Sequence, residues 1–355
     1  MVRIIKKKIE GGFYNSPVFS EYFGNMNIAV ADIETTGLSP GNSAVILGGA
    51  VIPDESEPES RLAVQYFADS VDDEEELLEL YVSLLCRYDC IITYNGIQFD
   101  IPFLKKRMER HRMESGGMDE IYSLDMYRIL KKYSELPRIL PNMKQKTVES
   151  FVTGSHIRTD TIDGALSVEL YYRYVTSDYD ERDHLLDMIL LHHFDDIVML
   201  SEILSLFRKT DIHAAMYGMG FPVKIGTDLF YIIDSVKLMK RSLRAEGRLF
   251  GNAAPFMYYG DDINVEITTG NGPDRTLFFN TEIFCKTVKA DGEYLVADLK
   301  RLELDVAEFE SLAGYESGYL ILGYKTKEKK TINHREINKL LRKELLWISD
   351  KKRWS

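Results

Sequence analysis

Cysteine is scarce in this chain of 355 residues, which contains only Cys86, Cys90 and Cys285. Cys86 and Cys90 stand four residues apart with no matching Cys or His pair nearby, and this spacing argues against a structural zinc site. An odd and sparse set of cysteines is typical of a reducing compartment, so we expect a cytoplasmic protein.

Long apolar runs, internal repeats and low-complexity tracts are also absent from the sequence. No run is long enough to span a bilayer, and the basic segment 1–8 lacks the apolar core of a signal peptide. Hydrophobic residues make up 45% of the chain and charged residues 28%, as in folded soluble proteins. We therefore expect no membrane partner, while protein partners are not indicated.

Positive charge is in deficit, because 44 Lys and Arg residues face 56 Asp and Glu residues and give a net charge of −12. Proteins that hold nucleic acid by charge alone are usually basic, so the deficit argues against a non-specific DNA coater. An enzyme that grips a strand end through bound metal and local basic patches is still compatible with this charge.

One basic cluster near the C-terminus could be such a patch, although a charge run is more often a solvated face. Its members are Lys325, Lys327, Lys329, Lys330, His334, Arg335, Lys339, Arg342 and Lys343, and Lys237, Lys240 and Arg241 could extend it.

Residues 24–210 are expected to form an α/β domain after an N-terminal lead-in, residues 1–23. Three meandering strands followed by β-α units predict a mixed five-stranded sheet flanked by helices. The expected strands are 27–33, 44–52, 61–68, 89–93 and 123–129, and the expected helices are 71–85, 99–111, 147–152, 165–175 and 180–208.

The pattern changes after residues 218–220, and we place a domain boundary near 210–220. Strand-like segments separated by Gly, Asp and Asn turns predict a smaller β-rich (α+β) domain over 221–355, ending in a basic helix. The expected strands are 276–281, 294–297 and 318–324, the turns lie at 270–273 and 291–292, and the helix covers 335–348.

Asp32 and Glu34 follow an apolar run and precede a Thr-Thr-Gly turn. Side chains two apart in a strand point to the same face, so these carboxylates would project together. Like charges this close raise each other's pKa unless a cation lies between them, and hard divalent ions prefer oxygen ligands. An exposed edge strand is the alternative, but the preceding residues are apolar on both faces, as in a central strand whose carboxyl end is a ligand site.

Asp100 ends a second segment, Asn95–Asp100, which follows another apolar strand. It is expected just inside a helix start at the mouth of the sheet, where it could equally serve the helix dipole. Phe99 could stack on a base, although a core position is commoner for an aromatic residue.

Asp196 lies on the long predicted helix, on an otherwise apolar face that it shares with His192. A carboxylate on such a face needs a partner, which the other carboxylates and bound cations would supply. Asp195 is rotated by about 100° from Asp196 and is the less favoured ligand. His192 or His193 could also be a structural histidine.

These three segments resemble, in the same order, the three motifs of the DEDD superfamily of 3′–5′ exonucleases. The chain also resembles the YprB-like branch of bacterial ribonuclease H-like proteins, through Lys-Thr-Val-Glu at 146–149 and Asp-Thr-Ile-Asp-Gly at 160–164. The resemblance covers about residues 24–208 and implies a ribonuclease H-like fold. It also implies a site for two Mg²⁺ or Mn²⁺ ions held by Asp32, Glu34, Asp100 and Asp196.

The resemblance further implies roles for neighbouring residues. His192 has the spacing of the tyrosine-type enzymes but the side chain of the histidine type, so either it or His193 would be the general base. Thr35, Thr36, Gly37 and Leu38 would meet the terminal nucleotide, with Leu38 as a wedge against the last base, while the two threonines could also simply form the turn. Asn95 and Phe99 complete the expected nucleic-acid contacts.

The function expected from these residues is metal-dependent 3′–5′ exonuclease activity on a single-stranded 3′ end of DNA or RNA. One alternative is a catalytically silent nucleic-acid-binding or scaffold protein on the same fold. The other is a structure-specific endonuclease.

Overall fold

The structure is a computed structural model in which the chain forms two compact units, Met1–Thr210 (unit 1) and Asp211–Ser355 (unit 2). It describes residues 1–353 except 58, 115, 155–163, 227–228, 252–254, 270–274, 283, 290–291, 306, 308, 310–317 and 326–329. Four expectations therefore lie wholly or partly outside the described residues, namely the turn at 270–273, residue 291 of the turn at 291–292, most of the 160–164 motif, and Lys327 with Lys329.

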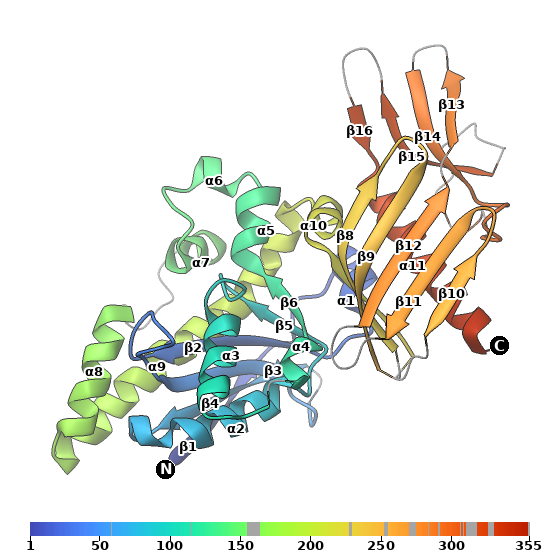
Figure 1. The fold of residues 1–355 in the computed structure, drawn as a ribbon. Helices are drawn as coiled ribbons and strands as arrows, with labels where there is room; N and C mark the ends of the chain where they lie inside the picture. The colour runs from blue at the N-terminus through green and yellow to red at the C-terminus, as the bar shows by residue number, and fades with distance from the viewer. Residues whose placement is uncertain are drawn as a thin grey trace. The chain divides into compact units, whose positions relative to one another are not determined.

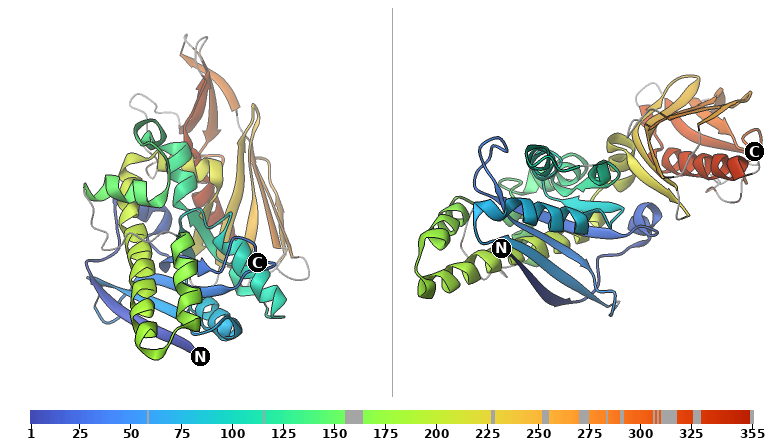
Figure 2. Two further views of the ribbon diagram at one scale, coloured as in Figure 1. Left: turned by 90° about the vertical axis from the view of Figure 1, so that its left-hand side faces the viewer. Right: turned by 60° about the horizontal axis from the view of Figure 1, so that its bottom comes forward.

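Unit 1 is built on one mixed sheet with helices on both faces (Figures 1 and 2). Its strands are β1 (Val2–Glu10), β2 (Ile28–Thr35), β3 (Val45–Pro53), β4 (Ser60–Ala68), β5 (Cys90–Thr93) and β6 (Tyr122–Asp125). Its helices are α1 (Pro17–Phe23), η1 (Val71–Asp73), α2 (Glu74–Leu85), α3 (Asp100–Arg110), α4 (Gly116–Asp119), α5 (Met126–Tyr133), α6 (Leu136–Ile139), α7 (Gln145–Thr153), α8 (Gly164–Thr176), α9 (Tyr179–Ile203) and η2 (Leu204–Lys209).

The sheet has six strands in the order β1-β4-β3-β2-β5-β6, so the expected count of five is wrong. The additional strand lies in the expected lead-in, where β1 pairs antiparallel with β4 from Val2↔Ala68 to Glu10↔Ser60. Its lysine run is exposed, as suits an edge strand protected by charge, and this composition hides the strand from a search for apolar runs. The other neighbours pair antiparallel, except that β2–β5 and β5–β6 are parallel.

Strand β6 is shorter than the expected strand 123–129 because Asp125 ends it. The Asp125 carboxylate accepts a hydrogen bond of 3.3 Å from the Arg128 amide and caps the N-terminus of α5. The apolar residues after Asp125 therefore belong to a helix.

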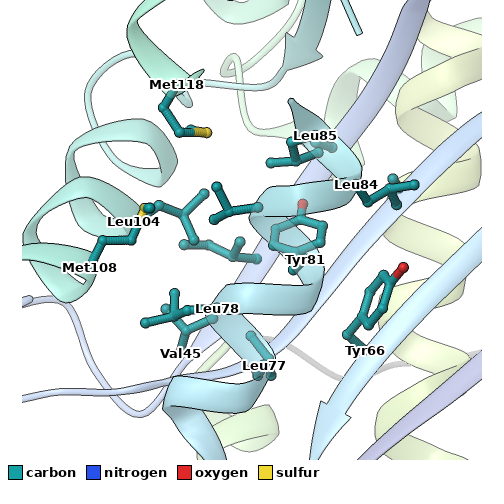
Figure 3. Close-up of a cluster of buried hydrophobic side chains, with 14 of the residues drawn as sticks. Val45, Tyr66, Leu77, Leu78, Tyr81, Leu84, Leu85, Leu104, Met108 and Met118 are labelled. Atoms are coloured by element: carbon teal, nitrogen blue, oxygen red, sulfur yellow. The ribbon is translucent and has the colours of Figure 1, made fainter. Parts of the chain in front are cut away.

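Two hydrophobic clusters lie on the two faces of this sheet. On one face Leu77, Leu78 and Tyr81 of α2 pack with Leu104 of α3, as Figure 3 shows. On the other face α8 and α9, which lie side by side in Figure 2, contribute residues such as Tyr171 and Ile189. The central strands are buried between these layers, which explains their continuous apolar runs.

Unit 2 is β-rich, as expected. Its strands are β7 (Phe221–Ile225), β8 (Leu229–Leu238), β9 (Ser242–Gly251), β10 (Phe256–Tyr259), β11 (Ile263–Thr269), β12 (Arg275–Glu282), β13 (Phe284–Lys289), β14 (Gly292–Asp298), β15 (Tyr319–Lys325) and β16 (Lys330–Ile332). They form a six-stranded sheet, β10-β11-β12-β9-β8-β7, and a four-stranded sheet, β13-β14-β15-β16.

Among its described residues, unit 2 also contains the helices α10 (Ile212–Met219) and α11 (His334–Arg353). Helix α11 extends beyond the expected 335–348 and buries Ile337, Leu341 and Ile348. The described part of the chain contains no helix that combines the length and apolarity needed to cross a membrane.

Candidate metal centre

Strand β2 carries Asp32 and Glu34 past the end of its parallel neighbour. The β2–β5 pairing covers only Ile28–Val30, and a register shift follows between Glu34 and Thr35 on the β3 side. The two carboxylates therefore stand on the part of β2 that extends beyond β5.

Asp100 takes up part of the edge of β2 that β5 leaves open. It is the first residue of α3, and its Oδ1 accepts a hydrogen bond of 3.3 Å from the Ile33 amide, between Asp32 and Glu34. Burial, together with the nearby Asp125 charge, raises the pKa of Asp100 to about 7.

His192, Asp196 and Glu34 form a compact group of donor atoms. His192 Nε2 lies 3.4 Å from Asp196 Oδ2, one turn further along α9, and 3.8 Å from Glu34 Oε1. All three donor atoms lie within 4.8 Å of one another, a spacing that could hold a metal ion. The neighbouring Asp195 is half-buried and does not belong to this group.

Glu34 has a strongly perturbed environment. Its burial and the Asp196 charge raise its pKa to about 8, and the Asp100 charge acts in the same direction. The Lys146 charge of α7 lowers it, and the buried Ser167 Oγ of α8 has no hydrogen-bond partner among the described residues. A cation placed among these carboxylates would remove the repulsion.

His193 points to Asp32 rather than to Glu34, and its tautomer follows from its contacts. Gln65 Nε2 donates to the Leu190 carbonyl at 3.0 Å, which fixes the amide orientation, so the same nitrogen donates to His193 Nδ1 at 3.0 Å. The proton of His193 is therefore on Nε2, which lies 3.4 Å from the Asp32 carbonyl and 3.8 Å from its Oδ2. Complete burial lowers the pKa of His193 to about 3, so the ring stays neutral.

Two glycines of β3 make this packing possible. Gly49 is paired with Asp32, and a Cβ at Gly49 would lie 2.2 Å from His193 Cε1. A Cβ at Gly48 would lie 2.6 Å from the Tyr81 ring, whose hydroxyl is 2.8 Å from the Gly49 carbonyl and 3.1 Å from that of Asp32. Gly48 thus allows α2, and Gly49 allows α9, to approach β3 closely from opposite faces of the sheet.

The Asn95–Asp100 segment is organised by Asp125, which is fully buried. Its two carboxylate oxygens accept hydrogen bonds from the amides of Asn95, at 2.9 Å, and Ile97, at 3.4 Å. Asn95 has a positive φ of 66°, a conformation that asparagine tolerates. Phe99 packs on the core beside Phe103, with ring centroids 5.4 Å apart, so its ring has the commoner core position.

The Thr35–Leu38 segment forms a turn held by its own side chains. Thr35 Oγ1 donates to the Gly37 carbonyl at 2.8 Å, and Thr36 Oγ1 accepts from the Ala44 amide at 2.9 Å. Leu38 follows with 86% of its surface exposed, an unusual position for a leucine. The side chains of Thr35 and Thr36 thus stabilise the turn, and the turn presents the apolar Leu38 side chain to solvent.

A buried ion pair fixes the loop that follows Leu38. Arg107 of α3 binds the Glu74 carboxylate with two nitrogens, and its Nη1 donates to the Pro40 carbonyl at 3.0 Å. Burial by itself would raise the pKa of Glu74, but hydrogen bonds from Arg107, His111 and the Val45 amide bring that pKa below its ordinary value. The loop is thereby tied to α2 and α3.

Comparison with known proteins identifies the family of the first unit. Residues 29–207 match the model of the RNase H superfamily. The chain belongs to the RNase H superfamily. Among similar solved structures is the family B DNA polymerase from the hyperthermophilic archaeon Pyrobaculum calidifontis, with 16% identity and a TM-score of 0.37. That match covers 51% of this chain and only 25% of the polymerase, and no curated protein matches the chain.

Within this RNase H-like unit, several residues that shape the site escaped the sequence motifs. Gln65 and Tyr81 reach it from β4 and α2, and Asp125 holds its loop from β6. Lys146 of α7 belongs to the 146–149 segment that carries the family resemblance, but that resemblance gave it no place at the site. Only the Gly48-Gly49 pair inside an apolar run could have signalled a close approach to β3.

Proposed function

We propose that unit 1 is a metal-dependent nuclease that removes nucleotides from the 3′ end of a single strand. The observation that carries this proposal is the convergence of Glu34, His192 and Asp196 within 4.8 Å, with Asp100 bound to the same strand. RNase H superfamily membership supports a nucleic-acid substrate and phosphodiester hydrolysis, and the finer assignment to a 3′ end rests on the three motifs.

The residues present fit a divalent cation. Oxygen donors suit Mg²⁺ and Mn²⁺, and a divalent ion would favour the ionised form of Glu34, whose pKa is raised by burial and by the Asp196 and Asp100 charges. Asp32, Glu34, Asp100 and Asp196 would hold two such ions. When bound, a metal pair lowers the pKa of an attacking water and stabilises the leaving oxygen.

His192 is the better candidate for the general base of the two histidines. Its Nε2 faces the carboxylate group, whereas both ring nitrogens of His193 are occupied by Gln65 and Asp32. In this proposal His193 positions Asp32, and His192 accepts a proton from the attacking water. Exposed Leu38 would rest against the terminal base, while Lys146 would lie near the phosphate.

The test is cleavage of 5′-labelled single strands of DNA and RNA with Mg²⁺ or Mn²⁺. We expect a ladder that shortens one nucleotide at a time from the 3′ end. The Asp32→Asn and Asp196→Asn variants should be slower by about 100-fold or more, because loss of a ligand costs at least as much as loss of a residue that orients one. Asp195→Asn, beside Asp196 on α9, is the matched control and should retain its activity.

A circular strand separates this proposal from its rivals. An exonuclease leaves the circle intact, whereas cleavage of the circle would replace the proposal with an endonuclease. Strand binding without turnover in either metal, unchanged by Asp32→Asn, would indicate a silent binding protein instead.

A further inference from the structure

The six-stranded sheet of unit 2 has one covered face and one open face. Helix α11 lies along the covered face (Figure 2), where the Tyr231 hydroxyl is 3.3 Å from Ser349 Oγ and the Thr281 hydroxyl donates to Glu344. The residues that point to the opposite face from β11, β12 and the first part of β9 are all exposed or half-buried, namely Asn264, Glu266, Thr268, Thr276, Phe278, Asn280, Arg244, Glu246 and Arg248. This open face is therefore accessible to a ligand.

A row of register partners crosses the open face and contains no carboxylate. This open-face row consists of Tyr259 of β10, Asn264 of β11, Asn280 of β12, Arg244 of β9 and Lys237 of β8. Register partners project from the same face of a sheet. Five adjacent strands take part, and a strand spacing of about 4.8 Å makes the row about 19 Å long.

The cationic end of the open-face row continues into the β8–β9 turn. Lys240 and Arg241 of this turn are exposed, as are Lys237 and Arg244, and the segment 237–245 contains no Asp or Glu. Within the described residues, none of these four cations forms an ion pair or any other recorded polar contact. Their charge is therefore not compensated by the protein.

Other basic groups of unit 2 are engaged by neighbouring side chains. Arg248, on the same open face, binds the Asp234 carboxylate with two nitrogens at 3.0 and 2.9 Å. Lys339, from the basic cluster near the C-terminus, lies over the Phe309 ring with Nζ 5.4 Å from its centroid. The contrast indicates that the β8–β9 cations serve an anionic ligand, in a chain whose net charge is −12.

An aromatic side chain stands at the other end of the open-face row. Tyr259 is 68% exposed, and its neighbour on the same face, Met257, is 60% exposed. Phe278 lies in the next row, between its register partners Glu266 and Glu246, and these two carboxylates would repel phosphates. An anionic chain is therefore favoured along the open-face row, where an exposed ring can stack on a base. An acidic peptide would use the cations alone.

We propose that the open-face row and the β8–β9 turn bind a single strand of nucleic acid. The phosphates meet Arg244, Lys237 and the two cations of the turn, and one base stacks on Tyr259. The amides of Asn264 and Asn280, between these ends, donate to or accept from the sugars and base edges. The inference takes the class of its ligand from the proposed function, whereas the site belongs to unit 2 alone.

The experiment measures binding to the full chain without divalent ions, which prevents hydrolysis. The probe is a fluorescent single-stranded 12-mer of DNA or RNA, read by anisotropy. We expect Tyr259→Leu to weaken binding at least about fivefold, the minimum for loss of one stacked base. Lys237→Ala and Arg244→Ala should each reduce the slope of log affinity against log salt by about 0.7, as for one phosphate contact on a single strand.

Matched controls come from the covered side of the same sheet. Tyr258 is the chain neighbour of Tyr259, but its ring packs against Trp347 of α11, with centroids 5.5 Å apart. Arg335 is an exposed cation of α11. Tyr258→Leu and Arg335→Ala should bind like the unchanged chain, and thermal unfolding checks that each variant is folded. Unchanged binding in Tyr259→Leu, or an equal loss in folded Tyr258→Leu, overturns the inference.

A second probe separates nucleic acid from an acidic protein segment. Polyglutamate of matched charge should bind more weakly than the 12-mer and should be insensitive to Tyr259→Leu. Polyglutamate that binds as tightly as the 12-mer would replace the inference with a site for an acidic partner.

Cleavage assays on the same variants keep this inference separate from the proposed function. A chain that never cleaves but binds through Tyr259 and Arg244 retains the strand site and loses the proposed function. A chain whose cleavage depends on Asp32 but whose binding ignores Tyr259 loses only the strand site.

Discussion

The pKa of Glu34 depends on its burial and on the charges of the neighbouring carboxylates. Its pKa of about 8, against an ordinary value of 4.5, means that the metal-free folded chain keeps a proton that the unfolded chain releases. The resulting stabilisation is fully present below pH 4.5 and is lost as the pH rises towards 8. A bound cation would reverse this effect, because metal binding requires the ionised carboxylate.

We therefore predict that the melting temperature of the metal-free chain falls from pH 5 to pH 8, and that Glu34→Gln reduces this fall. Added Mn²⁺ should raise the melting temperature more at pH 8 than at pH 6, and it should not do so in Glu34→Gln. Calorimetry measures both effects, with exposed Glu79→Gln as the control. Equal Mn²⁺ shifts in the variant and the unchanged chain would contradict Glu34 as a ligand.

Gln65 acts on the candidate metal centre indirectly, through the tautomer of His193. We predict that Gln65→Leu weakens Mn²⁺ activation or lowers the cleavage rate by about 10- to 100-fold, as loss of a group that orients a ligand usually does. The Mn²⁺ concentration for half-maximal activity and the turnover rate separate the two effects. Gln98→Leu, at an exposed position, should leave both values unchanged.

At the scale of elements, the central strands and the long helices follow from apolar periodicity, but their ends and edges do not. Strand β1 is stabilised by the register of β4 rather than by its own lysine-rich pattern. Strand β6 ends where Asp125 caps α5, although the apolar residues continue. The first outcome depends on a distant partner strand, which a local pattern cannot reveal. The second depends on a local cap at Asp125 that the search for apolar runs passes over.

The loop between β2 and β3 depends on the ion pair that joins α2 and α3. Arg107 and Glu74 are 7% and 1% exposed, so removing Arg107 leaves the buried Glu74 carboxylate with only His111 and the Val45 amide as partners. We predict that Arg107→Met lowers the free energy of unfolding by about 3–5 kcal/mol. The double variant with Glu74→Gln should recover about 1 kcal/mol or more in urea titrations, since the uncompensated charge is then absent. Simple additivity of the two changes would contradict the pair.

At the scale of the whole molecule, the two units contain separate buried acids. Glu344 of α11 is fully buried and both its oxygens accept from the Thr281 hydroxyl, at 2.9 and 3.1 Å. Burial raises its pKa well above the ordinary 4.5, so unit 2 also loses stability as the pH rises above that value.

We predict two thermal transitions, one for each unit. At pH 8, Glu344→Gln should raise the transition of unit 2, while Mn²⁺ and Glu34→Gln should act on that of unit 1. Scanning calorimetry of the full chain measures both. A single transition moved by both variants would mean that the units unfold together.

The sequence by itself determined the carboxylate motifs, the order of the central elements and the change to a β-rich pattern after residue 220. These features follow from the two-residue period of strands and the one-turn spacing of helices, which are local properties. Only the tertiary structure decided which histidine faces which carboxylate. Gln65 and His193 are 128 residues apart in the chain, and the missing side chain of Gly49 leaves room for the His193 ring. Contacts of that range depend on how the layers pack, and no spacing along the chain encodes them.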